Sequence, residues 1–232
     1  MNNFFRRLKY YGIGFGIGLI FVLLLFQQKG CSWTPSNRVK SAILERIIFV
    51  DSLDEEFLTS NRISKESLKT FIENGTISFL KSKRNGSEKL YHFYGDLGEL
   101  KSFNCIIAYR EKSVVIDIDF EHTDFKEYIP LDGYAKPYLY KKKNWFAGKW
   151  ELFNLNEIEP SNAPEKFSAM FLNNGLLNCH KSTLTGYNSI THFILKNRIT
   201  KDHERQYHIK TIWFKEKLEI KDLSIIDIKR NK

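Results

Sequence analysis

The sequence predicts an α+β protein that begins with an N-terminal transmembrane helix. Three observations predict this fold class. Residues 10–26 form an uncharged, mostly apolar run. Helical periodicity up to about residue 75 then gives way to the alternation typical of strands, and beyond about residue 140 the pattern is strand-like throughout. We therefore predict an anchor over residues 1–30, an α+β module over 38–124 and a β-rich module over 140–232.

The anchor has the dimensions of a membrane-spanning helix. At about 1.5 Å per residue, residues 10–26 span roughly 25 Å, and their polar and apolar neighbours extend this towards the roughly 30 Å of a bilayer core. Tyr10 and Tyr11 precede the run and Trp33 follows it, as expected for aromatic side chains at the headgroup level. We therefore predict an uncleaved helix that lies in the lipid bilayer, which is the first expected partner of this chain.

Two other kinds of leader begin with a similar pattern. A cleaved signal peptide has a shorter apolar core of about 7–15 residues and small residues at the cleavage site, and Gly30-Cys31-Ser32 supplies some small residues. A lipoprotein would be modified at Cys31, although Gln28 and Lys29 depart from the small apolar residues that such processing requires. Both remain alternatives to the uncleaved anchor.

The charges beside the apolar run predict an orientation. Arg6, Arg7 and Lys9 lie within a very short tail before it, whereas basic residues are sparser after it. The positive-inside bias then places the N-terminus inside and the bulk of the chain outside. We predict a single-pass protein of the inner membrane of a Gram-negative cell with a periplasmic domain; a cytoplasmic-facing domain is the alternative.

Glycines alternate within the predicted anchor. Gly12 with Gly16, and Gly14 with Gly18, form two G-x-x-x-G pairs on neighbouring faces of a helix. Such pairs allow close approach of two helices in lipid, so they predict packing between two copies and a homodimer through the transmembrane helix. The alternative is that glycine is simply common in spanning helices.

The first module is predicted to hold two helices packed on a four-stranded antiparallel sheet. Ser52 and Glu55 have the spacing of a helix N-cap box, and a second helix begins after Ser64 and ends at Asn74-Gly75. Further on, Asn85-Gly86 is a favoured hairpin turn. The strands are predicted within residues 76–84, 87–96, 99–110 and 113–122.

The run RISKESLKTFIENGTISFLKSKRNGSEKLYHFYG resembles domain of unknown function 4258. The leader FFRRLKYYGIGFGIGLIFVLLLF, followed by CSWTPSNRVK, is similar to the anchored bacterial branch of that family, and the likeness covers about the first 120 residues. The family has no established activity, but its layout is compared with small toxin ribonucleases. The resemblance thereby implies His92, Arg84, Arg110 and His122 as candidates for a ribonuclease or hydrolase, which is the alternative function.

The second module is predicted to be an all-β meander or partial barrel. Gly148-Lys149-Trp150, followed by residues 171–175 and 207–220, is similar to lipocalin-like bacterial domains, in which G-x-W closes one end of a barrel. Trp150, Phe171 and Trp213 are candidates for lining an apolar pocket, and the alternative places these aromatics in the core. The strand-like runs are residues 148–158, 166–172, 175–182, 188–197, 206–214 and 217–226.

Motifs for known chemistry are missing from the sequence. It has no P-loop, no Rossmann fingerprint, no H-E-x-x-H and no G-x-S-x-G. We therefore predict no catalytic residue, no metal site and no cofactor. Cys179 and His180 are adjacent, so their side chains would point to opposite faces of a strand, and His203 and His208 lack the spacing of a zinc site.

The remaining features concern partners. Cys105 and Cys179 would form the disulfide of an oxidised domain; otherwise Cys105 is a buried small hydrophobe. The run KKKNWFAGKW interleaves basic and aromatic residues, yet no nucleic-acid-binding fold accompanies it, so nucleic acid is not the expected partner. The hypothesis is a non-enzymatic, membrane-anchored envelope protein that binds an unknown protein partner or an apolar ligand.

Overall fold

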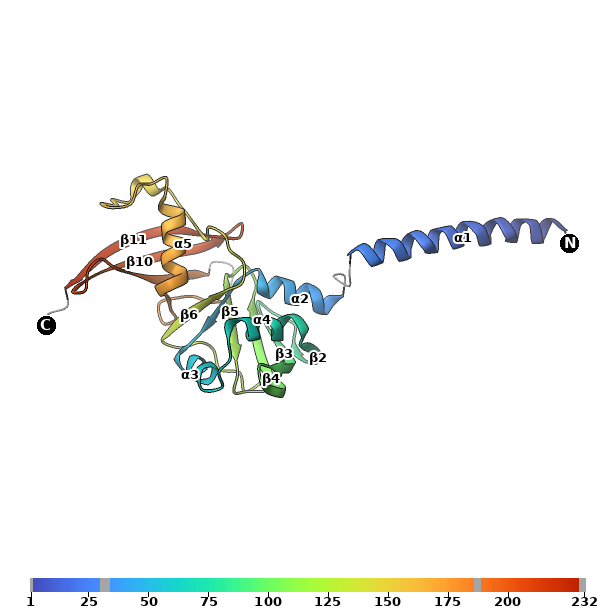
Figure 1. Cartoon of the computed structure of the whole chain (residues 1–232), viewed down its shortest axis with the longest axis horizontal. Helices are drawn as coiled ribbons and strands as arrows, with labels where there is room; N and C mark the ends of the chain where they lie inside the picture. Colours follow the sequence, from blue (N-terminus) through green and yellow to red (C-terminus); the bar gives the residue numbers. More distant parts are fainter. Residues whose placement is uncertain (1, 30–33, 186–188, 230–232) are drawn as a thin grey trace. The chain divides into compact units, whose positions relative to one another are not determined.

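The computed structural model describes residues 2–29, 34–185 and 189–229 (Figure 1). The chain divides into two compact units, Met1–Val39 and Lys40–Lys232. Within the described residues the fold is α+β, with an N-terminal apolar helix and one mixed sheet of 11 strands, which confirms the predicted class. The described residues do not include Cys31 of the lipoprotein alternative, Trp33 of the aromatic belt or Gly30 of the cleavage site.

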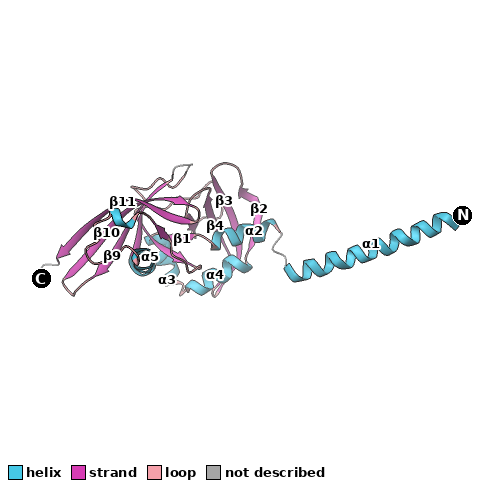
Figure 2. Cartoon of the chain, turned by 90° about the horizontal axis from the view of Figure 1, so that it is seen from above, coloured by secondary structure: helices cyan, strands magenta, loops and turns pink. Residues whose placement is uncertain are grey.

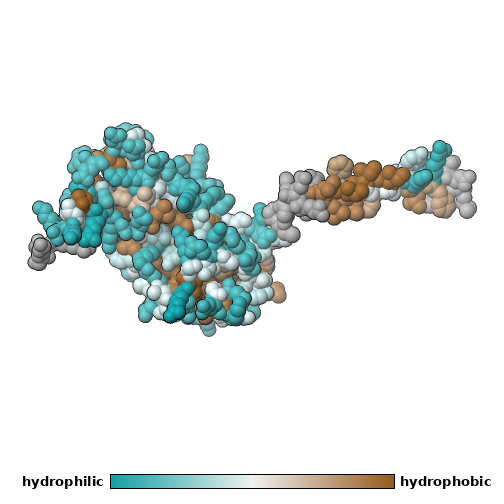
Figure 3. Space-filling model, in the orientation of Figure 1, coloured by the Kyte–Doolittle hydropathy of each residue, from teal (hydrophilic) through white to brown (hydrophobic). Residues whose placement is uncertain are grey.

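Helix α1 (Asn2–Lys29) contains the predicted anchor. Its segment Phe5–Leu24 is long and apolar enough to cross a membrane, and none of that segment is buried. Phe15, for example, is 74% exposed, and apolar residues cover the middle of the helix in Figure 3. A helix suits such a segment because all of its backbone hydrogen bonds are internal. Helix α2 (Pro35–Leu44) follows.

The first set of strands lies in the order β2-β3-β4-β5-β1. Neighbouring strands are antiparallel except β1, which runs parallel to β5. The sheet is therefore mixed, where the sequence predicted an antiparallel one. Its elements are β1 (Ile47–Val50), α3 (Ser52–Ser60), α4 (Lys65–Asn74), β2 (Thr76–Lys83), β3 (Glu88–Leu97), β4 (Leu100–Arg110) and β5 (Val115–Asp119).

The ends of the two helices follow from local hydrogen bonding. Ser64 caps α4 by accepting a hydrogen bond from the backbone N–H of Ser67 at 3.0 Å, as predicted. The prediction was wrong by one residue for α3, because Asp51 and not Ser52 is its N-cap. The Asp51 carboxylate accepts from two backbone N–H groups of the first turn, each at 3.0 Å, which a carboxylate does well at a helix N-terminus.

Strand β6 (Tyr134–Leu139) joins the first set of strands to a second. Residues 136–139 pair with β1 and residues 134–135 pair with β8, so the sheet is continuous. The second set has the order β8-β9-β10-β11-β7. Its elements are β7 (Phe146–Ala147), the 3-10 helix η2 (Trp150–Leu152), α5 (Ala163–Asn174), β8 (Gly175–Asn178), β9 (Ile190–Arg198), β10 (His203–Phe214) and β11 (Lys217–Lys229).

The second part of the chain is not all-β as predicted. Residues 166–172, taken as a strand, lie within α5, where Phe167, Met170 and Phe171 are buried at helical spacing and Pro164 stands in the first turn. Residues 148–158 hold η2 and turns in place of a strand. Strand β1 was missed because its four residues are all buried and show no alternation.

The two sets of strands share one topology. In each set, a short strand is followed by helical residues and then by four consecutive strands, each of which is antiparallel to the next. The last of the four pairs in parallel with the short strand, β5 with β1 and β11 with β7. We call residues 47–119 the first repeat and residues 146–229 the second repeat. Figure 2 shows α3 and α4 beside the first set and α5 beside the second.

The junction between helix and strand is the same in both repeats. The backbone N–H of Gly75 donates to the carbonyl of Phe71, and that of Gly175 donates to the carbonyl of Phe171. A Cβ atom would lie 2.6 Å from this oxygen at Gly75 and 2.5 Å at Gly175. Only glycine allows the backbone to come this close to the carbonyl. Phe171 and Gly175 each lie one hundred residues after their counterparts Phe71 and Gly75.

A serine bridge also recurs at this spacing. The Ser82 hydroxyl donates to the carbonyl four residues before it at 2.6 Å and accepts from the backbone N–H of His92 at 3.0 Å. Ser182 makes the same two bonds, the second with His192, at the same distances. The shared topology and the shared local hydrogen bonds identify an internal repeat. The recurrence of these residues one hundred positions apart is visible in the sequence itself.

The second repeat holds an aromatic core between α5 and the sheet. Phe171 of α5 lies 5.2 Å from Phe193 and 5.3 Å from Phe146, measured between ring centroids. Phe49 of β1 stacks on Phe193 at 6.0 Å. Because β1 supplies side chains to this core as well as to the first repeat, the two repeats form one compact unit.

Candidate functional site

One face of the first repeat is covered by the chain itself. Residues 121–131, here named the covering segment, lie over the sheet face opposite α4. Phe125 and Tyr128 of this segment pack on Leu90, Ile106 and Ala108. The sheet face that would otherwise expose these apolar side chains is thereby buried.

Two aspartates of β5 hold the covering segment. Asp119 accepts hydrogen bonds from the backbone N–H groups of Glu121 and His122, at 3.0 Å each, and of Ile129 at 3.1 Å. Asp117 accepts from the hydroxyl of Tyr128 at 2.5 Å. Backbone groups that are buried need such partners, so the two carboxylates fix the path of the segment.

A buried arginine completes this network. Arg110 is 1% exposed and donates to the Tyr128 hydroxyl at 2.7 Å. Its Nε atom lies 2.9 Å from a carboxylate oxygen of Glu88, and another nitrogen lies 3.5 Å from Asp117. Burial raises the pKa of Asp117 to about 6 although Arg110 opposes the rise, and burial together with Asp117 raises the pKa of Tyr128.

The same face of the second repeat is open. It holds a groove of about 400 Å³, which we name the second-repeat groove. Strand pairing aligns Lys210 with His192 and with Asp222, and the equivalent row of the first repeat aligns Ile106 with His92 and with Asp119. The three aligned residues of the first repeat are buried. In the second repeat Asp222 is exposed, and Lys210 and His192 are partly exposed. The groove is lined by Tyr134, Asn178, Lys181, His192, Phe193, Ile194, His208, Ile209, Lys210, Asp222, Ser224 and Ile226.

The second-repeat groove carries a small positive charge. Burial lowers the pKa of His192 and of His208, with smaller effects from nearby lysines, so both imidazoles are neutral at pH 7. Lys181 and Lys210 then outnumber the one carboxylate, that of Asp222. The apolar part is Ile194 and Ile226, and Ile226 is 46% exposed. This arrangement suits an anionic ligand with apolar side chains.

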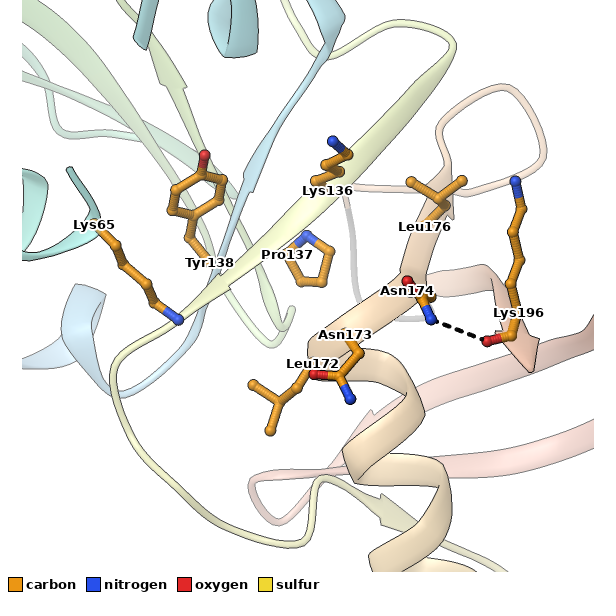
Figure 4. A pocket seen from close by; sticks show the side chains of 10 residues that line it. Lys65, Lys136, Pro137, Tyr138, Leu172, Asn173, Asn174, Leu176 and Lys196 are labelled. Carbon is orange, nitrogen blue, oxygen red and sulfur yellow. Dashed lines mark hydrogen bonds between the residues drawn. The ribbon is translucent and has the colours of Figure 1, made fainter. Parts of the chain in front are cut away.

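A second cavity of about 400 Å³ lies where the two repeats meet (Figure 4). Lys65, Lys136 and Lys196 line it, together with Asn174, which donates to the carbonyl of Lys196 at 3.5 Å. In Figure 4 the side chains of Lys136 and Lys196 point the same way and that of Lys65 points elsewhere, with the three nitrogens apart from one another, and Lys136 forms an ion pair with Glu55. The lysines therefore do not converge on one anion.

Of the residues implied as ribonuclease candidates, Arg110 and His122 have partners of their own, and the buried Nδ1 atom of His92 has no hydrogen-bond partner among the described residues. His92 is buried beneath the covering segment, and Arg110 belongs to the network described above. The His122 imidazole contacts the Asp119 carboxylate at 3.0 Å. Arg84 is exposed in the turn between β2 and β3. The Arg110 contacts hold the covering segment, and His122 with Asp119 is a partly exposed pair of residues three apart in the sequence.

The aromatic candidates lie in or against the core. Phe171 is fully buried and Trp150 is 6% exposed, and Trp213 packs against the same cluster from a partly buried position. The ring of Trp213 lies 6.4 Å from that of Trp145, with the ammonium group of Lys143 over both rings. The cavities described above are lined by other residues.

The structure also shows the surroundings of the cysteines and histidines that the sequence analysis considered. Cys105 and Cys179 are free, buried thiols, and burial raises the pKa of Cys179 to about 12. His180, next to Cys179, is largely exposed, so the two side chains diverge. His203 lies 3.6 Å from a carboxylate oxygen of Asp227. Among the described residues, no group of three or more His, Cys, Asp or Glu is arranged to hold a metal ion.

The glycines of α1 leave room for a neighbouring helix. A Cβ atom built on Gly12, Gly14, Gly16 or Gly18 meets no atom within 4 Å. The same holds for any exposed position of a helix that contacts nothing else, so packing between two copies through these glycines stays a prediction.

Comparison with known proteins gives no match: no family model, no curated protein and no solved structure is similar to this chain. The resemblances to domain of unknown function 4258 and to lipocalin-like domains therefore stay predictions. Sequence reasoning missed the second-repeat groove. The available signal was the His-Phe pair at residues 92–93, which returns at residues 192–193 and marks equivalent strands.

Proposed function

We propose that this chain is a single-pass, membrane-anchored binding protein without enzymatic activity. One observation carries the proposal: Phe5–Leu24 is a helical segment of 20 residues, long and apolar enough to cross a membrane, and none of it is buried. Its first turns carry Arg6, Arg7 and Lys9, so the part that lies in the bilayer core is the uncharged run of residues 10–26, which spans roughly 25 Å at about 1.5 Å per residue. An exposed apolar surface of this kind is stable in lipid and costly in water.

The compact unit Lys40–Lys232 supplies the binding function in this proposal. Its buried charged groups hold the covering segment and do not form a catalytic constellation. Its second repeat leaves open a face that the first repeat covers. We favour a protein partner over an apolar ligand because Trp150 and Phe171 fill the core.

Alkaline carbonate extraction of cell membranes tests the anchor. The full chain is expected in the pellet, and intact mass should show residues 1–30 retained. Replacing both Leu19 and Ile20 by lysine should release the protein, because each lysine at the centre of a spanning helix costs about 3 kcal/mol. The matched control makes the same change to lysine at Leu53 and Leu80, which are exposed on the compact unit. Release of the wild-type chain, or a mass that lacks the leader, would contradict the anchor.

The orientation follows from Arg6, Arg7 and Lys9, as proposed for an inner-membrane protein with its bulk in the periplasm. Proteinase added to spheroplasts should digest the unit Lys40–Lys232, while proteinase added to inverted vesicles should leave it intact. The reverse pattern would place this unit in the cytoplasm.

The glycines of α1 are proposed to pair two copies into a homodimer. Cross-linking in membranes should give less dimer when Gly14 is replaced by leucine, because the larger side chain separates the helices. The matched control is the same replacement at Ile13, beside Gly14. Equal dimer yield in all three chains would remove this part of the proposal.

A further inference from the structure

The first repeat shows how its sheet face is covered by a segment of bends and one turn, closed by the hydrogen bond from the Glu127 N–H to the carbonyl of Asp124 at 3.0 Å. The covering segment contributes two aromatic side chains to the apolar surface. Its backbone is held by the Asp119 carboxylate, which accepts a hydrogen bond from Ile129 at 3.1 Å. The segment has three acidic residues and one lysine, so it is acidic overall. These contacts are a template, inside this chain, for what the duplicated face accepts.

The second repeat has the matching features, and among the described residues its groove is open. Asp222 occupies the position that Asp119 has in the first repeat, at the end of the aligned row. Ile106, the buried middle residue of the first row, is replaced in the second by Lys210. The groove therefore keeps a carboxylate acceptor and gains a cation.

We propose that the second-repeat groove binds an acidic peptide segment of a partner protein, in the manner in which the covering segment binds the first repeat. Asp222 accepts a backbone N–H of the peptide, and Ile194 and Ile226 contact its apolar side chains. Lys181 and Lys210 attract its carboxylates. This inference rests on the proposed function, because it names the partner class of that binding unit.

The groove chemistry favours a peptide over a nucleic acid. A phosphate backbone would meet the Asp222 carboxylate of the groove lining, whereas a peptide backbone supplies an N–H group that donates to this carboxylate. Single-stranded nucleic acids bind through several stacked aromatic rings, and of the two Phe and Tyr rings in the groove lining Phe193 is buried and Tyr134 alone is exposed.

The test uses the full chain in detergent micelles and a labelled synthetic peptide with the sequence of the covering segment, EHTDFKEYIPL. Fluorescence anisotropy measures the dissociation constant. The control peptide has the same sequence with its three acidic residues replaced by lysine. Binding to the first repeat is excluded because the chain's own segment already occupies that face at high effective concentration.

Two variants probe the groove by different means. Lys210→Glu reverses a charge, and Ser224→Trp fills the groove from an exposed strand position. Each should weaken binding about tenfold or more. The matched control, Lys201→Glu, makes the same charge change in the exposed turn between β9 and β10. Thermal unfolding confirms that each variant is folded.

The proposal is supported if the acidic peptide binds, if 0.5 M salt weakens binding, and if only the two groove variants lose affinity. It is overturned by absence of binding at millimolar peptide or by equal binding to all variants. Stronger binding of single-stranded DNA would replace it with a nucleic-acid site. Self-association that Ser224→Trp abolishes would replace it with a second copy of the chain. Membrane extraction is measured separately, so failure of the anchor and failure of the groove are distinguishable.

Discussion

Replacing Asp54 by asparagine should remove a pH-dependent loss of stability. Asp54 lies in the first turn of α3 and is 8% exposed. Its carboxyl accepts a hydrogen bond from the backbone of Phe120, but burial and the negative charges of Asp51, Asp117 and Asp119 raise its pKa to about 8. The folded protein therefore keeps a proton at neutral pH that the unfolded chain releases.

The direction and size of the change in unfolding free energy with pH follow from the difference between the folded and unfolded pKa of Asp54. Because the pKa of Asp54 is raised in the folded state, its contribution is fully favourable below the unfolded pKa of 3.8 and is lost as pH rises towards 8. Each pH unit inside this window is worth about 1.4 kcal/mol. Between pH 5 and pH 8 the free energy of unfolding of the wild-type chain should fall by about 4 kcal/mol from this group alone, whereas the asparagine variant should lose none of it.

Urea unfolding at pH 5, 6, 7 and 8, followed by tryptophan fluorescence, measures the free energy of unfolding. Glu56→Gln is the matched control, since it removes a carboxylate from the exposed side of the same helix. The wild type and this control should share the steep decline with pH, and Asp54→Asn should flatten it. Parallel curves for all three chains would refute the assignment of a buried, protonated carboxyl to Asp54.

Three further outcomes are expected. Gly175→Ala should lower the free energy of unfolding by about 2 kcal/mol because its Cβ would meet a carbonyl at 2.5 Å, while Gly148→Ala, with 3.4 Å available, should cost less; equal costs in urea titrations would contradict this. Tyr128→Phe should destabilise by about 2 kcal/mol and speed proteolysis of the covering segment, and unchanged cleavage would argue against its anchoring hydroxyl. The thiols of Cys105 and Cys179 should react with Ellman's reagent only after denaturation, and a reduction-dependent thiol count would indicate a disulfide instead.

The sequence by itself determined the features that depend on neighbouring residues. A run of apolar residues is sufficient to identify the helix that can cross a membrane, because length and polarity alone decide whether a segment suits lipid. Ser64 and Gly75 bound α4 through hydrogen bonds within one turn. The four strands from β2 to β5 follow from alternation, and no partner is needed to recognise it.

The tertiary structure decided the features that depend on distant pairing. The strand β1 has no periodicity of its own, and its parallel partner β5 lies some 70 residues away. The helix α5 was read as a strand because its buried residues are close together, and only packing on β9 shows that they share one helical face. The second-repeat groove exists because a segment covers one sheet face and leaves the other open. That difference is a relation between two surfaces, and no local pattern of residues contains it.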